Sequence, residues 1–203
     1  MNKSRYSLVA TIVACTLAAC ASVQESAQKV EARASCCKSM AEMHFEHLRK
    51  AESQSFTLDD TSPVFSFDIG KSYFKAYTLP TGGKNTKLKV TSNPTGSIGF
   101  EPTKLSQVFC PQATFLDENF GTLVSIRRVP TYVRGFGLIS EFEIPEPTKY
   151  VVLHTNPSIY GALVTRYTLG GGYAVGNNFV FERGGEPIHH PCGPVADASV
   201  EVQ

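Results

Sequence analysis

From residue 64 to the end of the chain, short runs of alternating apolar and polar residues recur, with turn-forming residues between them. Residues 138–144, Leu-Ile-Ser-Glu-Phe-Glu-Ile, show the pattern clearly. A period of two is typical of a β-strand with one buried face, because successive side chains point to opposite sides. No long helical period separates these runs, which argues against a parallel α/β sheet.

The expected strands are rich in β-branched and aromatic residues and are bounded by Gly, Pro, Asn and Asp. They cover residues 64–68, 72–79, 88–90, 108–116, 123–127, 138–144, 150–155 and 198–202. Residues 150–155, Tyr-Val-Val-Leu-His-Thr, are the most apolar run, and we expect them at the centre of a sheet. Residues 159–166 fit either a short helix or a strand. About eight or nine short strands predict a mainly β protein, an antiparallel β-sandwich.

The N-terminal part has a different composition, and three segments are predicted. Residues 1–19 are expected to be a signal peptide, residues 20–62 a lipidated tether with a short helix, and residues 63–203 the sandwich domain. Within residues 21–48, apolar or small residues return at steps of three and four, which is the period of a helix. Ala predominates in this stripe, so a marginal helix is preferred to a coiled coil. Residues 49–62 are polar and are expected to form a loop.

The first residues have the features of an export signal. Lys3 and Arg5 precede residues 6–17, which are apolar or small, and a pair of small residues leads to Cys20. A basic start, a short apolar run and small residues at the cut define a secretory signal. The apolar run is shorter than the roughly 20 residues of a membrane-spanning helix. The sequence therefore predicts export and removal of residues 1–19.

Leu17-Ala18-Ala19-Cys20 resembles the bacterial lipobox, in which the cysteine carries the lipid. A rival match at Cys15 leaves an apolar run too short for a signal. The alternative is an ordinary signal peptide that happens to contain cysteine. Two or more acyl chains, such as palmitate, hold a protein stably at a membrane. Residue 21 is Ala rather than Asp, which by resemblance to enterobacterial sorting rules predicts the outer membrane, facing the periplasm.

Four further cysteines belong to the expected mature chain: Cys36, Cys37, Cys110 and Cys192. Exported proteins keep disulfides, and four cysteines allow three pairings. A bond between neighbouring residues closes a small, strained ring, so we expect Cys36 and Cys37 to bond separately, one with Cys110 and the other with Cys192. A metal or redox site is the less favoured alternative, because adjacent cysteines lack the two-residue spacing of zinc and thioredoxin motifs.

Sequence motifs for catalysis are missing. The glycine-rich stretch lacks the Lys-Ser/Thr of a phosphate loop, and no carboxylate pair is singled out for glycoside hydrolysis. His44 and His47 would share a face only on a helix. His189 and His190 lie in residues 169–193, which are rich in Gly and Pro and are expected to be a long loop. We expect no enzyme, no metal and no cofactor. The formal net charge of +1 gives no basic footprint for nucleic acid.

Sugar-stacking side chains would have to be Tyr or Phe, because the chain has no Trp. Five tyrosines are candidates to line a sugar-binding groove: Tyr73, Tyr77, Tyr132, Tyr167 and Tyr173. Aromatic residues on strands more often belong to the core, and this is the alternative for each of them.

Three segments of the chain are similar to segments of one known family. Residues 66–80 end in Leu-Pro and lead to Leu88-Lys89-Val90, residues 109–120 contain Leu-Asp-Glu-Asn, and residues 150–155 end in Thr. On these segments, and on the adjacent cysteines near the mature start, residues 36–202 resemble the maltose operon periplasmic protein family. The resemblance implies a periplasmic protein of maltose and maltodextrin uptake, with no catalytic motif to transfer. The lipobox is a departure from that family.

The sequence thus predicts a lipid-anchored accessory or binding protein of carbohydrate transport, whose partners are the membrane and either a maltodextrin or an envelope protein. A sugar-binding module requires exposed aromatic side chains beside polar groups on one sheet face. The alternative, a lipoprotein that docks on an outer-membrane protein without binding sugar, requires a contiguous apolar surface. An enzyme, the third class, requires a cleft with titratable groups of shifted pKa.

Overall fold

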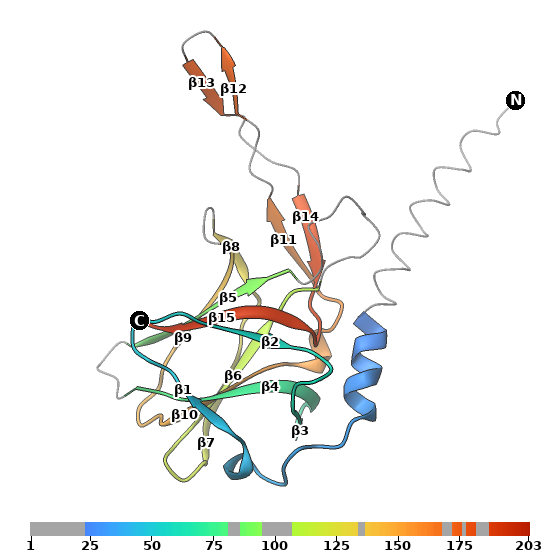
Figure 1. Ribbon diagram of the computed structural model, residues 1–203, viewed down its shortest axis with the longest axis vertical. Coiled ribbons are helices and arrows are strands. Elements are labelled where there is room, and N and C mark those ends of the chain that lie inside the picture. Colours follow the sequence, from blue (N-terminus) through green and yellow to red (C-terminus); the bar gives the residue numbers. More distant parts are fainter. Residues whose placement is uncertain are drawn as a thin grey trace, which may run out of the picture.

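A computed structural model of the protein describes residues 23–80, 86–94, 107–133, 137–167, 172–175, 178–181 and 187–203. It shows a mainly β protein built around two sheets (Figure 1). Sheet A has the strand order β1-β4-β10-β6-β7, with β3 also paired to β4, and sheet B has the order β2-β15-β5-β9-β8. Neighbouring strands are antiparallel except β1 and β4, which are parallel.

The strands of sheet A are β1 (Phe45–His47), β3 (Val64–Phe67), β4 (Gly70–Thr78), β6 (Pro111–Leu116), β7 (Thr122–Arg127) and β10 (Tyr150–Thr155). The strands of sheet B are β2 (Gln54–Leu58), β5 (Lys87–Asn93), β8 (Thr131–Val133), β9 (Gly137–Glu143) and β15 (Ala196–Val202). Two hairpins extend beyond the sheets in Figure 1: β11 (Leu163–Tyr167) with β14 (Pro187–Pro191), and β12 (Gly172–Val175) with β13 (Asn178–Phe181). The short 3-10 helices are η1 (Met40–Glu42) and η2 (Pro157–Ile159), and residues 23–32 form an α-helix.

The main core lies between the two sheets and explains the alternating sequence. Sheet A contributes Tyr77 and Phe115, and sheet B contributes Phe56 and Phe142. Rings from opposite sheets meet edge-on, at centroid separations of 6.2 Å for Phe56–Tyr77 and 6.4 Å for Phe115–Phe142. Burying a large apolar side chain contributes about 1.5–3 kcal/mol. The β-sandwich expected from the sequence is therefore confirmed, and β10 is central in sheet A, between β4 and β6.

The sandwich begins earlier in the chain than expected. Residues 49–62 were expected to be a loop, and this is wrong, because β2 lies in this segment and pairs with β15. Before it, β1 joins sheet A, and the chain crosses to sheet B where the Ala51 N–H donates to the Val202 carbonyl over 2.8 Å. A five-residue strand with two buried side chains, Phe56 and Leu58, gives too short a periodic signal to stand out from its polar surroundings.

The glycine- and proline-rich C-terminal stretch also differs from expectation. Residues 169–193 were expected to be a long loop, but β12, β13 and β14 all lie within them. Their runs are only four or five residues long. Runs this short, flanked by Gly, Asn and Pro, give too little periodic signal to be distinguished from a loop.

The N-terminal helix, residues 23–32, packs against the sandwich, as Figure 1 shows in blue. Val30 is 1% exposed and belongs to the main core. The ammonium of Lys71 on β4 donates to the carbonyls of Glu31 and Arg33, both at 2.9 Å, where the negative end of a helix favours a cation. This helix is thus part of the domain rather than a free tether. Within the described residues, we find no helix with both the length and the apolar character to cross a membrane.

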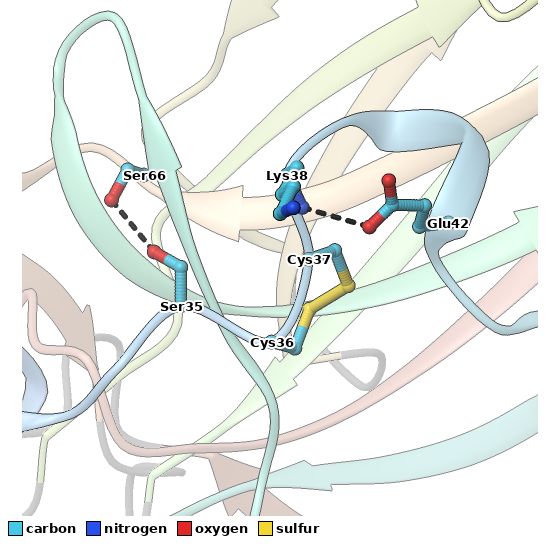
Figure 2. Close-up of a disulfide and its surroundings, with 6 residues drawn as sticks. All are labelled: Ser35, Cys36, Cys37, Lys38, Glu42 and Ser66. Atoms are coloured by element: carbon cyan, nitrogen blue, oxygen red, sulfur yellow. Dashed lines mark hydrogen bonds between the residues drawn. A yellow bond between two sulfur atoms is a disulfide. The ribbon is translucent and has the colours of Figure 1, made fainter.

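All four expected cysteines form disulfides, but the expected pairing is wrong. Cys36 bonds to its neighbour Cys37 (Figure 2), and Cys110 bonds to Cys192. The Cys36 N–H donates to the Val64 carbonyl over 2.8 Å, which holds the first pair beside β3. Cys110 and Cys192 lie instead in a separate buried cluster, with a Cα–Cα distance of 5.5 Å. The fold therefore places the two disulfides in different parts of the protein, and the spacing of the cysteines in the sequence does not reveal this.

We predict that the two disulfides differ in their contribution to stability. Cys110 and Cys192 are 82 residues apart in sequence, and a bond that closes a loop of this length contributes about 4.5 kcal/mol by restricting the unfolded chain. Replacing both by Ala should lower the free energy of unfolding in urea by about this amount. The matched control, Cys36→Ala with Cys37→Ala, should lower it by less than about 1 kcal/mol, because a bond between neighbours closes no long loop. Equal losses for the two variants would contradict this account.

Candidate functional site

The outer face of sheet A changes character across the sheet. Around β3 and β4 it is apolar, and Phe65, Phe67 and Phe74 pack there with Met43 from the N-terminal segment. On β6, Ala113 and Phe115 face the main core, so Gln112, Thr114 and Leu116 face outward. Leu116 belongs to the apolar cluster, whereas Gln112 and Thr114, with Ser125 on β7, make the neighbouring part of this face polar.

A hollow with a volume of about 380 Å³ lies where these two regions meet, and we call it the sheet A hollow. Its lining residues are Met40, Phe65, Ser66, Phe67, Asp68, Ile69, Gln112, Thr114, Phe120, Thr122, Ser125 and His154. They come from β3 and the turn after it, β6, the β6–β7 connection, β7, β10 and the N-terminal segment. Gly70, the first residue of β4 after this turn, has a φ of +117°, a backbone conformation that favours glycine.

A chain of side-chain hydrogen bonds crosses the floor of the hollow. His154 Nε2 and Thr114 Oγ1 are 3.1 Å apart, and Thr114 Oγ1 lies 2.8 Å from Ser125 Oγ. The Gln112 amide donates to the same Ser125 oxygen over 2.7 Å and accepts from the Asn156 amide over 3.1 Å. Strand register creates this network, because Thr114 is opposite Ser125 and Gln112 is opposite His154.

His154 is the most buried polar side chain of this network, with an exposed fraction of 1%. Its ring stacks on Phe67 with a centroid separation of 3.8 Å and an interplanar angle of 8°. Burial lowers the pKa of His154 to about 3, against a smaller opposing effect of the Thr155 backbone. The imidazole is therefore neutral at neutral pH.

The Thr114–His154 contact has the separation of a nucleophile and its base, but its environment is unsuited to that chemistry. A base with a pKa of about 3 holds a proton poorly at neutral pH. Thr114 is itself buried, with 3% of its surface exposed. The arrangement is better suited to binding a neutral polar molecule through hydroxyls and amides.

A larger pocket of about 530 Å³ lies at one end of the sandwich, beside Pro145 and Pro147. Asp117 lines it, but its carboxylate already accepts the backbone N–H groups of Asn119 and Gly121, both at 2.8 Å. The carboxylate of Asp117 therefore stabilises the turn between β6 and β7. We regard the sheet A hollow as the better candidate because its polar groups converge on one wall.

The structure does not gather the five candidate tyrosines into a groove. Tyr73 and Tyr77 are in the main core, with exposed fractions of 1% and 0%, so their expected role in sugar binding is wrong. Burial raises the pKa of Tyr77, an effect that the nearby Glu46 strengthens. Tyr132 is half-buried beside the Cys110–Cys192 cluster. The backbones of Tyr167 and Tyr173 lie on β11 and β12, and their side chains are outside the described residues.

The other expected site residues are also accounted for. Cys20 and residues 1–19, the expected signal peptide, are outside the described residues. His44 precedes β1 and His47 lies on it, in extended backbone rather than a helix. His189 lies on β14, where Nδ1 is 2.9 Å from Thr165 Oγ1. In the part of the chain that the structure describes, no three His, Cys, Asp or Glu side chains are grouped to hold a metal ion.

Sequence reasoning missed the polar residues of the hollow. A usable signal was present, because His154 is polar within the most apolar strand, and Gln112 and Thr114 interrupt the buried strand β6. Polar groups are buried at a cost unless they find hydrogen-bond partners. Polar residues in two strands predicted to be buried therefore indicate a shared network, although only the register shows that they meet.

We predict that His154 makes stability depend on pH. As pH falls below about 6.5, the unfolded chain binds a proton on this histidine and the folded protein does not, so the folded state loses stability. With a folded pKa of about 3, the expected loss between pH 7.5 and pH 5 is about 2 kcal/mol. His154→Gln should remove that part of the difference in urea unfolding, whereas the exposed His47→Gln should retain it. An unchanged pH dependence in His154→Gln would show that His154 is not buried and neutral.

Comparison with known proteins finds no protein-family model that matches this sequence, and neither a curated protein nor a solved structure is significantly similar to it. The functional interpretation therefore rests on the residues and geometry of the sheet A hollow.

Proposed function

We propose that this protein is a lipid-anchored, periplasm-facing, non-enzymatic binding protein of maltodextrin transport, and that the sheet A hollow receives part of a neutral oligosaccharide. One observation carries the proposal: the hollow places aromatic rings beside a hydrogen-bonded row of side-chain hydroxyls and amides. Sugars present apolar C–H faces and many hydroxyls, so they are bound by this combination of groups. Ligand sites in general combine apolar walls with a few placed polar groups.

The charge of the lining favours a neutral ligand. Asp68 is the one carboxylate among the described lining residues, and no Lys or Arg lines the hollow there. His154 is neutral because of its burial. The wall offers an anionic ligand no opposite charge, and it offers a cation only Asp68. A neutral sugar needs only hydrogen bonds.

The size of the hollow supports recognition of a short segment of a chain. Its volume of about 380 Å³ is near the lower end of the range of about 300–1,000 Å³ that is typical of ligand sites. Polar groups on the wall would fix the orientation of the bound sugar units. The remainder of a longer oligosaccharide would extend past the rim, so affinity should stop rising once the hollow is filled.

The number of carboxylates that line the hollow favours a binding role over glycoside hydrolysis. Glycoside hydrolysis needs two carboxyl groups about 5–9.5 Å apart on either side of the scissile bond. The described lining offers Asp68 alone. The chemistry that the hollow can perform is therefore hydrogen bonding and ring stacking.

Docking on an outer-membrane protein without sugar binding is the alternative function. The described large apolar side chains that are exposed are Ile69, Leu123, Val129, Val133 and Leu163. They lie on five different segments, from the turn after β3 to β11. Val133 and Leu163 lie on β8 and β11, which contact each other, but two side chains make a smaller patch than a docking surface requires.

We predict that the protein binds maltodextrins in calorimetric titration. The sample should be residues 21–203, exported so that both disulfides form, because a shorter fragment would lose the core residue Val30. Saturable heat should appear with maltose, grow with chain length and then reach a plateau. Ser125→Ala should weaken binding about tenfold, since losing one ligand hydrogen bond costs about 1.4 kcal/mol.

Ser199→Ala is the matched control, because it removes the same hydroxyl from β15 on sheet B and should leave affinity unchanged. Equal weakening by both variants would place the site elsewhere. An absence of heat at millimolar sugar with folded protein would rule out sugar binding and favour the docking alternative.

We also predict that Cys20 carries the lipid. In cells supplied with labelled palmitate, the wild-type protein should take up label and fractionate with the outer membrane. Cys20→Ser should abolish the label, because no thiol is left at the cleavage site, whereas Cys15→Ser should keep it. Label that persists in Cys20→Ser would contradict the lipobox assignment.

A further inference from the structure

The bond between Cys36 and Cys37 lies beside β3 (Figure 2). Cys36 is exposed, and Cys37 is half-buried against the apolar cluster on the outer face of sheet A. Cys36 is therefore more accessible to an incoming thiol than Cys37. The rate of exchange at a disulfide depends on access to the attacked sulfur, so attack at Cys36 Sγ is favoured over attack at Cys37 Sγ.

The second disulfide provides an internal comparison. Cys110 and Cys192 have exposed fractions of 0% and are surrounded by Val108, Leu138 and Val164. A reductant can reach this bond only if the surrounding structure opens. Reduction would also remove the stabilisation that the bond gives by restricting the unfolded chain. Neither obstacle applies to a bond between neighbouring residues at the surface.

We propose that Cys36–Cys37 is a thiol–disulfide exchange site that a dithiol reduces while the rest of the protein remains folded, and that Cys110–Cys192 is structural. The inference goes beyond the proposed function and does not depend on sugar binding. The partner it implies is a dithiol, either a small molecule or a pair of cysteines in another exported protein.

The reaction balances with a dithiol as the two-electron reductant. One thiolate of the dithiol attacks Cys36 Sγ, the Cys36–Cys37 bond breaks, and its electron pair goes to Cys37 Sγ, which takes a proton. In the mixed disulfide, one sulfur of the dithiol is bonded to Cys36 Sγ. The second thiolate of the dithiol attacks that sulfur and releases Cys36 as a thiolate, which is also protonated. The dithiol leaves as a disulfide, and the protein gains two thiols.

Contacts other than the sulfur–sulfur bond hold this segment in place. The Cys36 N–H donates to the Val64 carbonyl over 2.8 Å, and Ser35 Oγ is 2.7 Å from Ser66 Oγ. The Lys38 N–H donates to Glu42 Oε2 over 2.9 Å, as Figure 2 shows. The reduced thiols remain neighbours in sequence and on this anchored segment, so an oxidant can close the bond again.

The test uses the whole purified protein and differential labelling. Free thiols are blocked with N-ethylmaleimide, dithiothreitol is added under native conditions, and new thiols are trapped with deuterated N-ethylmaleimide. Trypsin cleaves after Arg33 and Lys38, so Cys36 and Cys37 share the peptide 34–38, while Cys110 and Cys192 fall in peptides 105–127 and 184–203. Mass spectrometry then follows each disulfide separately.

We expect peptide 34–38 to acquire two deuterated labels at least about 100-fold faster than the other two peptides, with an unchanged near-ultraviolet circular dichroism spectrum. The inference is overturned if the two disulfides open at similar rates, or if peptide 34–38 gains label only as the spectrum is lost. Ordinary label on peptide 34–38 in the blocking step would show free thiols and would also overturn it.

Two single variants test which sulfur is attacked. Cys37→Ser leaves the exposed Cys36 thiol, and Cys36→Ser leaves the half-buried Cys37 thiol. The first should react with an aromatic disulfide reagent at least about tenfold faster, because access controls the rate. Equal rates would refute the directional attack on Cys36.

Discussion

The pairing of β10 with β4 and β6 is the constraint on which both the core and the candidate site depend. Val151 and Leu153 point into the main core, so Val152 and His154 must point to the outer face of sheet A. A slip of one residue would exchange the two faces, exposing apolar side chains and placing the imidazole in the core. The register that buries the core therefore also places His154 beside Phe67, and the hollow is a consequence of correct core packing.

The outer face of a sheet in a sandwich commonly faces water, but much of this one is covered. Met43 from the N-terminal segment packs over the apolar residues of β3 and β4, and Cys37 of the adjacent-cysteine disulfide packs against the same cluster. The cover stops before β7, and the hollow lies at that boundary. A site at such a boundary has apolar rings on one side and hydrogen-bonding groups on the other, which suits a ligand with both kinds of surface.

Several features of the fold followed from local sequence alone. The long strands β4, β9 and β10 were predictable, because each buries alternate or continuous apolar residues over many positions. The shorter strand β2 was not, since five residues give little periodicity, and its strand conformation depends on pairing with β15 from the far end of the chain. Likewise, Tyr73 and Tyr77 looked like groove residues, although the face of β4 on which they lie is the one that sheet B covers.

The sequence by itself determined the class of fold and the presence of disulfides, because these depend on short-range pattern and residue type. Tertiary structure decided which cysteines pair, which tyrosines are buried, and that Gln112, Thr114, Ser125 and His154 form one network. These outcomes require strands far apart in sequence to be set side by side in one register. Register is fixed by the burial of the whole core, and therefore no local stretch of sequence contains it.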